Sequence, residues 1–284
     1  MPTRVTLFRM KIIILSTLVV LASCGKTSSE NPIVIKSSII GGTEVTRDDY
    51  ESLSVVGLRD KTTTCSGTLV SEDLIVTAAH CVSKWQPKTR TGVSKRKIVT
   101  TPVIFYSYKK EVMHTYIRMD QVEIFPAEDY DDEANKDLAV VKLKEKAPLG
   151  YKAVPILSPD YSIQRNSELL LVGFGYRDEF NNDDNFNLPR APHKIKIPFV
   201  EVRDTKIVVS QEHGKIGSFF GDSGGPAYLE TENGLLLAGS TQGGSKVAPE
   251  GYYINLGSFK QFILDSAKKM NATAPVFLMP DEIK

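Results

Sequence analysis

Two short segments far apart in the chain carry complementary chemistry, and together they constrain the fold more than any other feature. Residues 221–226 read Gly-Asp-Ser-Gly-Gly-Pro, and residues 77–81 read Thr-Ala-Ala-His-Cys. A serine hydroxyl is a useful nucleophile near neutral pH only when a neighbouring base takes its proton, and histidine commonly serves as that base. We therefore expect a fold in which Ser223 and His80 meet.

A third segment supplies a carboxylate for this histidine. Asp137 lies in Asn-Lys-Asp-Leu-Ala-Val-Val-Lys-Leu at 135–143. A buried carboxylate holds the imidazole in the correct tautomer and stabilises its charged form. Taken singly, serines, histidines and aspartates are usually surface or capping residues. Found together in these contexts, His80, Asp137 and Ser223 are predicted to be catalytic.

The bulk composition is that of a globular protein. The 284 residues are 41% hydrophobic and 24% charged, and the formal net charge of +1 gives no electrostatic case for binding nucleic acid. A basic segment at 84–110 and an acidic one at 128–133 are interpreted as solvated loops. A substrate-steering rim and a calcium loop are the alternatives, but the acidic segment lacks the glycine-containing spacing of an EF-hand.

Short β-rich runs separated by Gly, Pro, Asn and Asp dominate the chain from about residue 39. They lie at 66–76, 98–105, 138–143, 169–174, 195–202 and 235–240. This pattern predicts an all-β barrel or sandwich. Apolar residues at helical spacing predict one C-terminal helix at 258–270.

The first residues are interpreted as an export signal. Arg4, Arg9 and Lys11 precede a largely apolar run at 12–22. That run is shorter than the roughly 20 residues that span a bilayer. It ends in Leu-Ala-Ser-Cys, which resembles the bacterial lipobox, so Cys24 is the predicted lipidation site. The alternative is a plain signal peptide with a chance cysteine.

The number of cysteines fits a lipidated Cys24. The chain has three cysteines, and an odd number in an exported protein leaves one without a disulfide partner. Lipidation of Cys24 leaves Cys65 and Cys81, which an oxidising compartment would allow to pair. Two buried thiols are the alternative. The disulfide is preferred because it would fasten the loop that carries His80 to the neighbouring strand.

The motifs at 77–81 and 221–226, in the chain order His, Asp, Ser, resemble those of the trypsin/chymotrypsin family of serine proteases. Supporting similarities are Cys-Ser-Gly-Thr-Leu-Val at 65–70, Val-Gly-Phe-Gly at 172–175 and Gly-Tyr-Tyr-Ile at 251–254. The resemblance covers roughly 39–270. It implies an all-β, chymotrypsin-like fold of two six-stranded antiparallel β-barrels with a C-terminal helix, and a disulfide between Cys65 and Cys81.

The same resemblance implies a serine endopeptidase that works through an acyl-enzyme. Ser223 attacks the scissile carbonyl, His80 moves the proton, and Asp137 orients the imidazole. The backbone N–H groups of Gly221 and Ser223 would form the oxyanion hole. Neither a cofactor nor a metal is expected. A protease homologue that binds proteins without catalysis, or remains a zymogen, is the alternative function.

Activation in the family involves a new N-terminus that pairs with the aspartate before the serine. Here that end would be Ile39, in Ile-Ile-Gly-Gly, and its partner Asp222. Ser38 precedes Ile39, whereas a trypsin-like activator requires Lys or Arg. A different activating protease, or another route to the new end, is therefore expected.

The predicted specificity pocket departs from that of trypsin, because Gly217 stands where an aspartate would bind basic side chains. An open, uncharged pocket predicts an apolar or aromatic residue before the scissile bond, although Glu250 could intrude and favour a basic one. The disulfides that usually brace the second barrel are missing, since no cysteine follows Cys81. The predicted lining consists of Gly217, Ser218, Gln242, Gly243, Gly244 and Gly251.

The predicted organisation follows from these assignments. Residues 1–23 form a lipoprotein-type signal, 24–38 a tether or propeptide, 39–272 the protease domain, and 273–284 a tail. The two barrels are expected at roughly 39–155 and 156–257. The expected partners are a protein or peptide substrate, an activating protease, and a membrane reached through the lipid on Cys24. The expected location is the outer membrane or periplasm, or outside the cell after cleavage.

Overall fold

The computed structural model describes residues 39–45, 53–59, 64–85, 96–107, 113–125, 136–175, 191–212, 215–245 and 247–283. The chain divides into two units, Met1–Val34 and Ile35–Lys284. The first unit, with the predicted signal and Cys24, lies outside the described residues. So do the tether, the acidic segment 128–133 and much of the basic segment 84–110.

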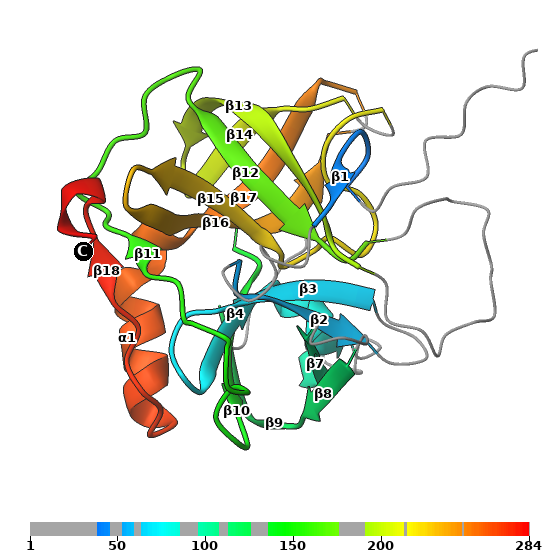
Figure 1. The fold of residues 1–284 in the computed structure, drawn as a ribbon, viewed down its shortest axis with the longest axis vertical. Helices are drawn as coiled ribbons and strands as arrows, with labels where there is room; N and C mark the ends of the chain where they lie inside the picture. Colours follow the sequence, from blue (N-terminus) through cyan, green and yellow to red (C-terminus); the bar gives the residue numbers. More distant parts are fainter. Residues whose placement is uncertain are drawn as a thin grey trace, which may run out of the picture. The chain divides into compact units, whose positions relative to one another are not determined.

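The first sheet is antiparallel throughout and has the order β8-β7-β2-β3-β4-β10-β9 (Figure 1). Its end strands β8 and β9 are separated only by Arg118, so they form one bent strand that joins the two edges of the sheet. Six passes of the chain therefore make the first barrel. The strands are β2 (Val55–Arg59), β3 (Thr64–Leu69), β4 (Leu74–Thr77), β7 (Val103–Ser107), β8 (Met113–Ile117), β9 (Met119–Phe125) and β10 (Leu138–Leu143).

The second sheet closes on itself, because β15 pairs with both β12 and β16 around the ring β15-β12-β13-β14-β17-β16. Three two-residue strands extend it: β1 pairs with β13, and β11 joins β16 to β18. Its strands are β1 (Thr43–Glu44), β11 (Ile156–Leu157), β12 (Glu168–Gly173), β13 (His193–Arg203), β14 (Lys206–Ser210), β15 (Pro226–Thr231), β16 (Gly234–Gly244), β17 (Glu250–Asn255) and β18 (Phe277–Leu278). A separate small ladder joins β5 (Ser83–Trp85) to β6 (Arg96–Ile98).

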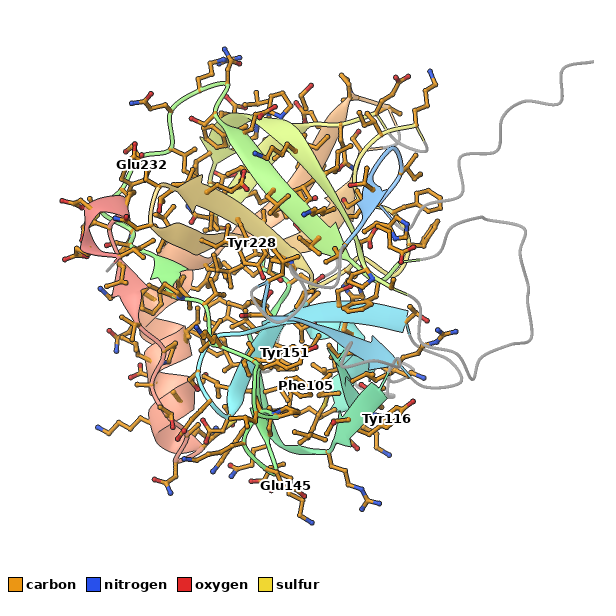
Figure 2. All side chains as sticks on the ribbon, in the orientation of Figure 1. Phe105, Tyr116, Glu145, Tyr151, Tyr228 and Glu232 are labelled. Atoms are coloured by element: carbon orange, nitrogen blue, oxygen red, sulfur yellow. A yellow bond between two sulfur atoms is a disulfide. The ribbon has the colours of Figure 1, made fainter. Side chains whose placement is uncertain are left out.

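Strands where the barrels meet are buried on both faces. In β10, Ala139, Val141 and Leu143 point into the first barrel, where Phe105 and Tyr151 pack edge to face with ring centroids 4.9 Å apart (Figure 2). The alternate residues of β10, Leu138 and Val140, belong to the core shared with the second barrel. Because successive side chains of a strand point to opposite faces, only a continuously apolar run can satisfy both cores.

One aromatic residue connects the two barrels directly. Tyr228 of β15 is buried in the shared core (Figure 2), and its hydroxyl donates a hydrogen bond to the carbonyl of Leu53, just before β2. A buried phenol needs such a partner, because an unpaired hydroxyl in an apolar core is costly.

The C-terminal part packs against both barrels. A 3₁₀ turn, η3 (Leu256–Phe259), leads into the helix α1 (Lys260–Lys269). Ile263, Ala267 and Met270 insert into the shared core. The following segment adds β18 to β11 and ends in the 3₁₀ turn η4 (Pro280–Glu282). The predicted helix at 258–270 is thus formed as η3 followed by α1.

The predicted all-β, two-barrel fold with a C-terminal helix is confirmed. Within the described ranges, no helix has the length and apolarity needed to cross a bilayer.

Candidate active site

His80 and Asp137 meet in the structure. His80 lies on the 3₁₀ turn η2 (Ala79–Cys81), which follows β4 after Ala78. Asp137 directly precedes β10, and the β10–β4 ladder pairs Ala139 with Thr77. This register brings residues 57 positions apart into contact. The imidazole Nδ1 lies 2.5 Å from Asp137 Oδ2, and the backbone N–H of His80 donates to Oδ1 at 2.9 Å.

The two side chains differ sharply in exposure. Asp137 is 3% exposed and the His80 side chain 40%. A carboxylate that accepts the Nδ1 proton fixes the tautomer in which Nε2 carries a lone pair. The imidazole can then accept a proton at Nε2, while the buried carboxylate compensates the resulting positive charge.

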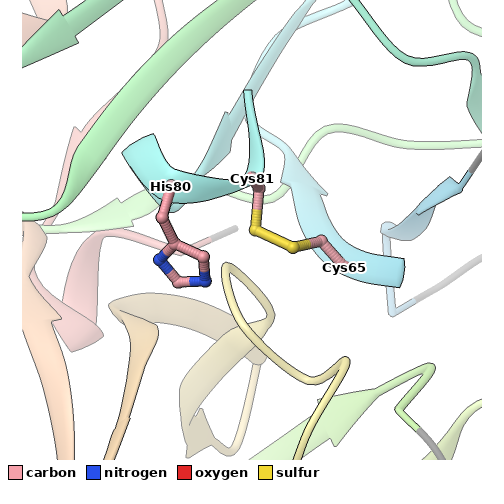
Figure 3. A group of neighbouring side chains, drawn as sticks. All are labelled: Cys65, His80 and Cys81. Atoms are coloured by element: carbon pink, nitrogen blue, oxygen red, sulfur yellow. A yellow bond between two sulfur atoms is a disulfide. The ribbon is translucent and has the colours of Figure 1, made fainter. Parts of the chain in front are cut away.

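The predicted disulfide is present beside this histidine (Figure 3). Cys65 of β3 and Cys81 of η2 are bonded, with Cα atoms 6.0 Å apart. Possible ligand atoms of Cys65, His80 and Cys81 lie within 4.8 Å of one another. A cysteine binds zinc as a thiolate, and these two sulfurs are bonded to each other, so the cluster is explained by the disulfide.

The backbone of Ser223 packs on the segment that carries His80. Its carbonyl accepts a hydrogen bond from Ser66 N at 2.8 Å and lies 3.6 Å from Cys81 Sγ. The next residue, Gly224, has a φ of +79°, and a Cβ there would lie 2.1 Å from Thr77 Oγ1. Only glycine permits this approach, which seats the serine loop against residues on both sides of His80.

Ser66 organises the loop before the serine. Its hydroxyl donates to the carbonyl of Gly221 at 3.1 Å and accepts from Phe174 N at 3.0 Å. Its own carbonyl accepts a hydrogen bond from Thr77 Oγ1 at 2.7 Å. The residue is fully buried. Ser66 therefore links the serine loop, the histidine strand and the Gly-Phe-Gly turn.

Asp222 is completely buried. Its carboxylate accepts hydrogen bonds from Gly175 N at 2.9 Å and from Phe219 N at 2.8 Å. Burial raises the pKa of Asp222 to about 8, against the opposing effect of these two donors. Ile39 and Ile40 are also buried, and Ile40 exchanges two backbone hydrogen bonds with Gly217, of 2.9 and 3.0 Å.

The predicted lining of the specificity pocket comes from the loop before Ser223 and from β16 and β17. Register pairs Gly244 with Gly251, and a bulge after Thr241 leaves Gln242 outside the ladder. The side-chain oxygen of Gln242 is buried and, among the residues described, has no hydrogen-bond partner. A Cβ on Gly243 would have no atom of the described residues within 4 Å, apart from its chain neighbours. Gly217, Gly244 and Gly251 converge on one side chain that was not predicted, that of Gln211.

Glu250 is engaged elsewhere. Its two carboxylate oxygens each accept a hydrogen bond from the Arg203 guanidinium, at 3.1 Å, and one accepts from the Tyr252 hydroxyl at 2.7 Å. Arg203 also binds Glu201. The Arg203 and Tyr252 hydrogen bonds lower the pKa of Glu250. The contacts of Glu250 therefore give no support to the alternative in which it enters the pocket and favours a basic residue.

Comparison with known protein families matches residues 39–263 to the family described as trypsin. The chain belongs to the trypsin family. It is accordingly a serine endopeptidase, as the sequence predicted.

Individual proteins that are similar in sequence to this trypsin-family protein support the family assignment. It is 28% identical to the chymase of Canis lupus familiaris over 239 residues, which cover 80% of this chain and 84% of the relative. It is 26% identical to a snake venom serine protease of Crotalus durissus durissus, covering 75% and 82%. Among solved structures, a mutant of human heparin binding protein is similar, with a TM-score of 0.63 and 16% identity. That match covers 84% of this chain and 100% of the other, and it supports the fold alone.

Sequence reasoning missed two residues of the site in this trypsin-family protein, Ser66 and Gln211. Ser66 follows Cys65 in a segment whose sequence predicts only a strand. Its one signal was a hydroxyl in a run expected to be buried, which requires partners. Gln211 carried no signal, since it lies outside every motif.

Proposed function

We propose that this protein hydrolyses peptide bonds with Ser223 as nucleophile, His80 as general base and acid, and Asp137 as the group that orients the imidazole. The observation that carries the proposal is the double contact of Asp137 with the side chain and backbone of His80. His80 Nε2 would remove the Ser223 proton during attack and return it to the leaving amine. The acyl-enzyme is then hydrolysed by water through the same steps.

The oxyanion of the tetrahedral intermediate would be bound by the backbone N–H groups of Gly221 and Ser223. Support comes from Gly221, whose φ of +94° is unfavourable for other residues. The carbonyl of Asp222 accepts a hydrogen bond from Gly225 N at 2.8 Å, and because the carbonyl and the N–H of one planar peptide point in opposite directions, this bond fixes the direction of the Ser223 N–H. Loss of one such donor typically lowers kcat by about 10²–10³.

The proposed substrate has an uncharged side chain before the scissile bond, apolar or aromatic. Gly217 offers no carboxylate at the base of the predicted pocket, and Arg203 binds both oxygens of Glu250. A basic side chain would thus find no partner charge there, and its desolvation would oppose binding.

Cleavage between Ser38 and Ile39 is proposed as the activating step. The new ammonium group would pair with the Asp222 carboxylate, which burial otherwise makes difficult to ionise. Supporting this, residues 39 and 40 are buried in the uncut chain and Ile40 already pairs with Gly217. Because Ser38 is not basic, the activating protease would differ from trypsin in specificity.

The proposal also includes the N-terminal region. An export signal at 1–23 and a lipid on Cys24 would anchor the protein at the outer membrane or in the periplasm. Cleavage at the 38–39 bond would then activate the enzyme and release it in one step. Support for this part comes from the sequence pattern alone.

Intact mass and N-terminal sequencing of the exported protein, with and without a fluorophosphonate, test both parts. We expect a chain that begins at Ile39 and carries one label on Ser223, and no label on a Ser223→Ala control. A folded chain that begins at Ile39 but stays unlabelled would favour the non-catalytic alternative. Labelled protein that keeps its lipid and an intact 38–39 bond would contradict the activation step.

A further inference from the structure

We propose that the Gln211 carboxamide forms the floor of the specificity pocket and limits the enzyme to peptides with a small, uncharged side chain before the scissile bond. This inference rests on the proposed function and limits its uncharged side chain to small residues, which excludes the aromatic ones. It follows from the packing, hydrogen bonds and charge around Gln211.

Gln211 points into the second barrel from the end of β14. It follows Ser210, which pairs with Glu250 of β17, and its own N–H donates to the Pro249 carbonyl at 3.1 Å. The residue is 1% exposed, although the chain around it is polar. A glutamine at this depth must be surrounded by groups that fit its carboxamide.

Three of the predicted pocket-lining glycines surround this carboxamide. A Cβ on Gly217 would lie 2.5 Å from Gln211 Oε1, and one on Gly251 would lie 2.4 Å from the same oxygen. A Cβ on Gly244 would lie 2.6 Å from Nε2. These separations are far inside van der Waals contact. The glycines therefore make room for Gln211, rather than for a large substrate side chain.

Ser218 holds the carboxamide in place. Gln211 Oε1 accepts hydrogen bonds from Ser218 N and Ser218 Oγ, both at 3.2 Å, and Nε2 donates to Ser218 O at 3.3 Å. All three polar groups of Ser218 are thus bound by one side chain. Admitting an aromatic ring would break these bonds inside a buried site, so Gln211 acts as a fixed floor.

The backbone places this floor close to the nucleophile. Ser218 precedes Ser223 by five positions, in the loop that carries the serine. Beside that loop runs β16, whose Thr241 carbonyl accepts a hydrogen bond from Gly224 N at 2.8 Å. From Thr241, β16 continues to Gly244 opposite Gly251. The serine loop and β16 therefore lie beside Ser223 at one end and contact Gln211 at the other, through Ser218 and Gly244.

The floor carries no formal charge. Gln211 is neutral, and the nearest acid along β17, Glu250, is bound by Arg203. The Asp222 carboxylate is directed at Gly175 N and Phe219 N. Nε2 carries a second N–H besides the one that binds Ser218, so it can donate to a small polar side chain. Alanine-sized and serine-sized residues fit this description.

Cleavage of matched peptides that differ only in alanine or phenylalanine before the scissile bond tests the inference. The cleaved enzyme is expected to prefer alanine by about 10-fold or more in kcat/KM. Gln211→Gly should reverse this preference by raising kcat/KM for phenylalanine. Gln211→Asn, one methylene shorter, should give an intermediate ratio. Gln261→Ala, which alters a glutamine that binds Asp265 on the surface of α1, should change neither value.

A small fluorophosphonate, measured in parallel, separates this inference from the proposed function. No labelling of the wild-type enzyme would refute the proposed function itself. Normal labelling with equal cleavage after alanine and phenylalanine would overturn the role of Gln211, as would a labelled Gln211→Gly variant with an unchanged ratio. If Gln211→Gly fails to fold, the wild-type ratio and Gln211→Asn still decide the matter, because a gain in phenylalanine cleavage cannot come from general damage.

Discussion

Removal of the Cys65–Cys81 disulfide should weaken both the fold and the active site. The cysteines are 16 positions apart, and the bond joins β3 to the turn that carries His80. Opening a loop of this length returns conformational entropy to the unfolded chain that corresponds to about 3 kcal/mol. In a chain of this size the melting temperature would fall by about 6–12 °C, at about 2–4 °C per kcal/mol.

The effect on the site should exceed what the loss of stability alone produces. Cys81 follows His80 directly, and its sulfur lies 3.6 Å from the Ser223 carbonyl. Without the bond, η2 can shift relative to the serine loop, and small misplacements of catalytic groups are costly. We expect fluorophosphonate labelling to slow at temperatures where the variant is still fully folded.

The experiment compares Cys65→Ala/Cys81→Ala with wild-type protein, before and after reduction. Reduction breaks the bond without removing sulfur, so it serves as the matched control for lost packing. Thermal unfolding gives the stability, and labelling at 25 °C gives the reactivity of Ser223. If the melting temperature decreases by less than about 2 °C both in the double variant and in the reduced wild-type protein, the argument from loop closure is refuted.

Two further results are expected. Ser66→Ala should lower the free energy of unfolding in denaturant by about 1–3 kcal/mol, because the buried Gly221 carbonyl and Phe174 N–H lose their partner. Fluorophosphonate labelling of Ser223 should also slow, and unchanged labelling would contradict the anchoring role of Ser66. In the uncut chain the pKa of Asp222 is raised to about 8. Its contribution to stability should therefore be greatest below about pH 4 and be lost as pH rises toward 8, whereas chains cut before Ile39 should not show this loss. If the melting temperatures of the cut and uncut chains change with pH in the same way, the proposed pairing of the Ile39 ammonium group with Asp222 is contradicted.

Much of the fold was predictable because its signals are local. Segment 138–143 is apolar at nearly every position, and the structure buries it between two cores. The histidine and serine motifs are equally local. Each contains the residues its backbone needs, such as Gly224, which lets the serine loop lie on Thr77. Such features can be read from a few neighbouring residues.

Gln211 could not be predicted, because its environment is made by distant strands. The pairing of β14 with β17 buries it, and glycines at 217, 244 and 251 close around it. The sequence alone made those glycines look like the lining of an open pocket. Glycine leaves space, but the sequence does not say which side chain fills that space. The proposed substrate preference therefore depends on a long-range contact.

The C-terminal segment beyond the family match illustrates the same limit. After α1, the carbonyls of Met270 and Asn271 accept hydrogen bonds from Lys142 of the first barrel, and Thr273 binds Asp73 and Glu72 at its edge. A few residues later β18 joins the second barrel through β11. The first group of contacts is largely exposed, and exposed polar contacts contribute little to stability. Most of the free energy that keeps the C-terminal segment in place must therefore come from the apolar side chains of α1 and from the β18 ladder. In a chain with no cysteine after Cys81, this segment is a continuous link between the barrels, and it is built from packing instead of covalent bonds.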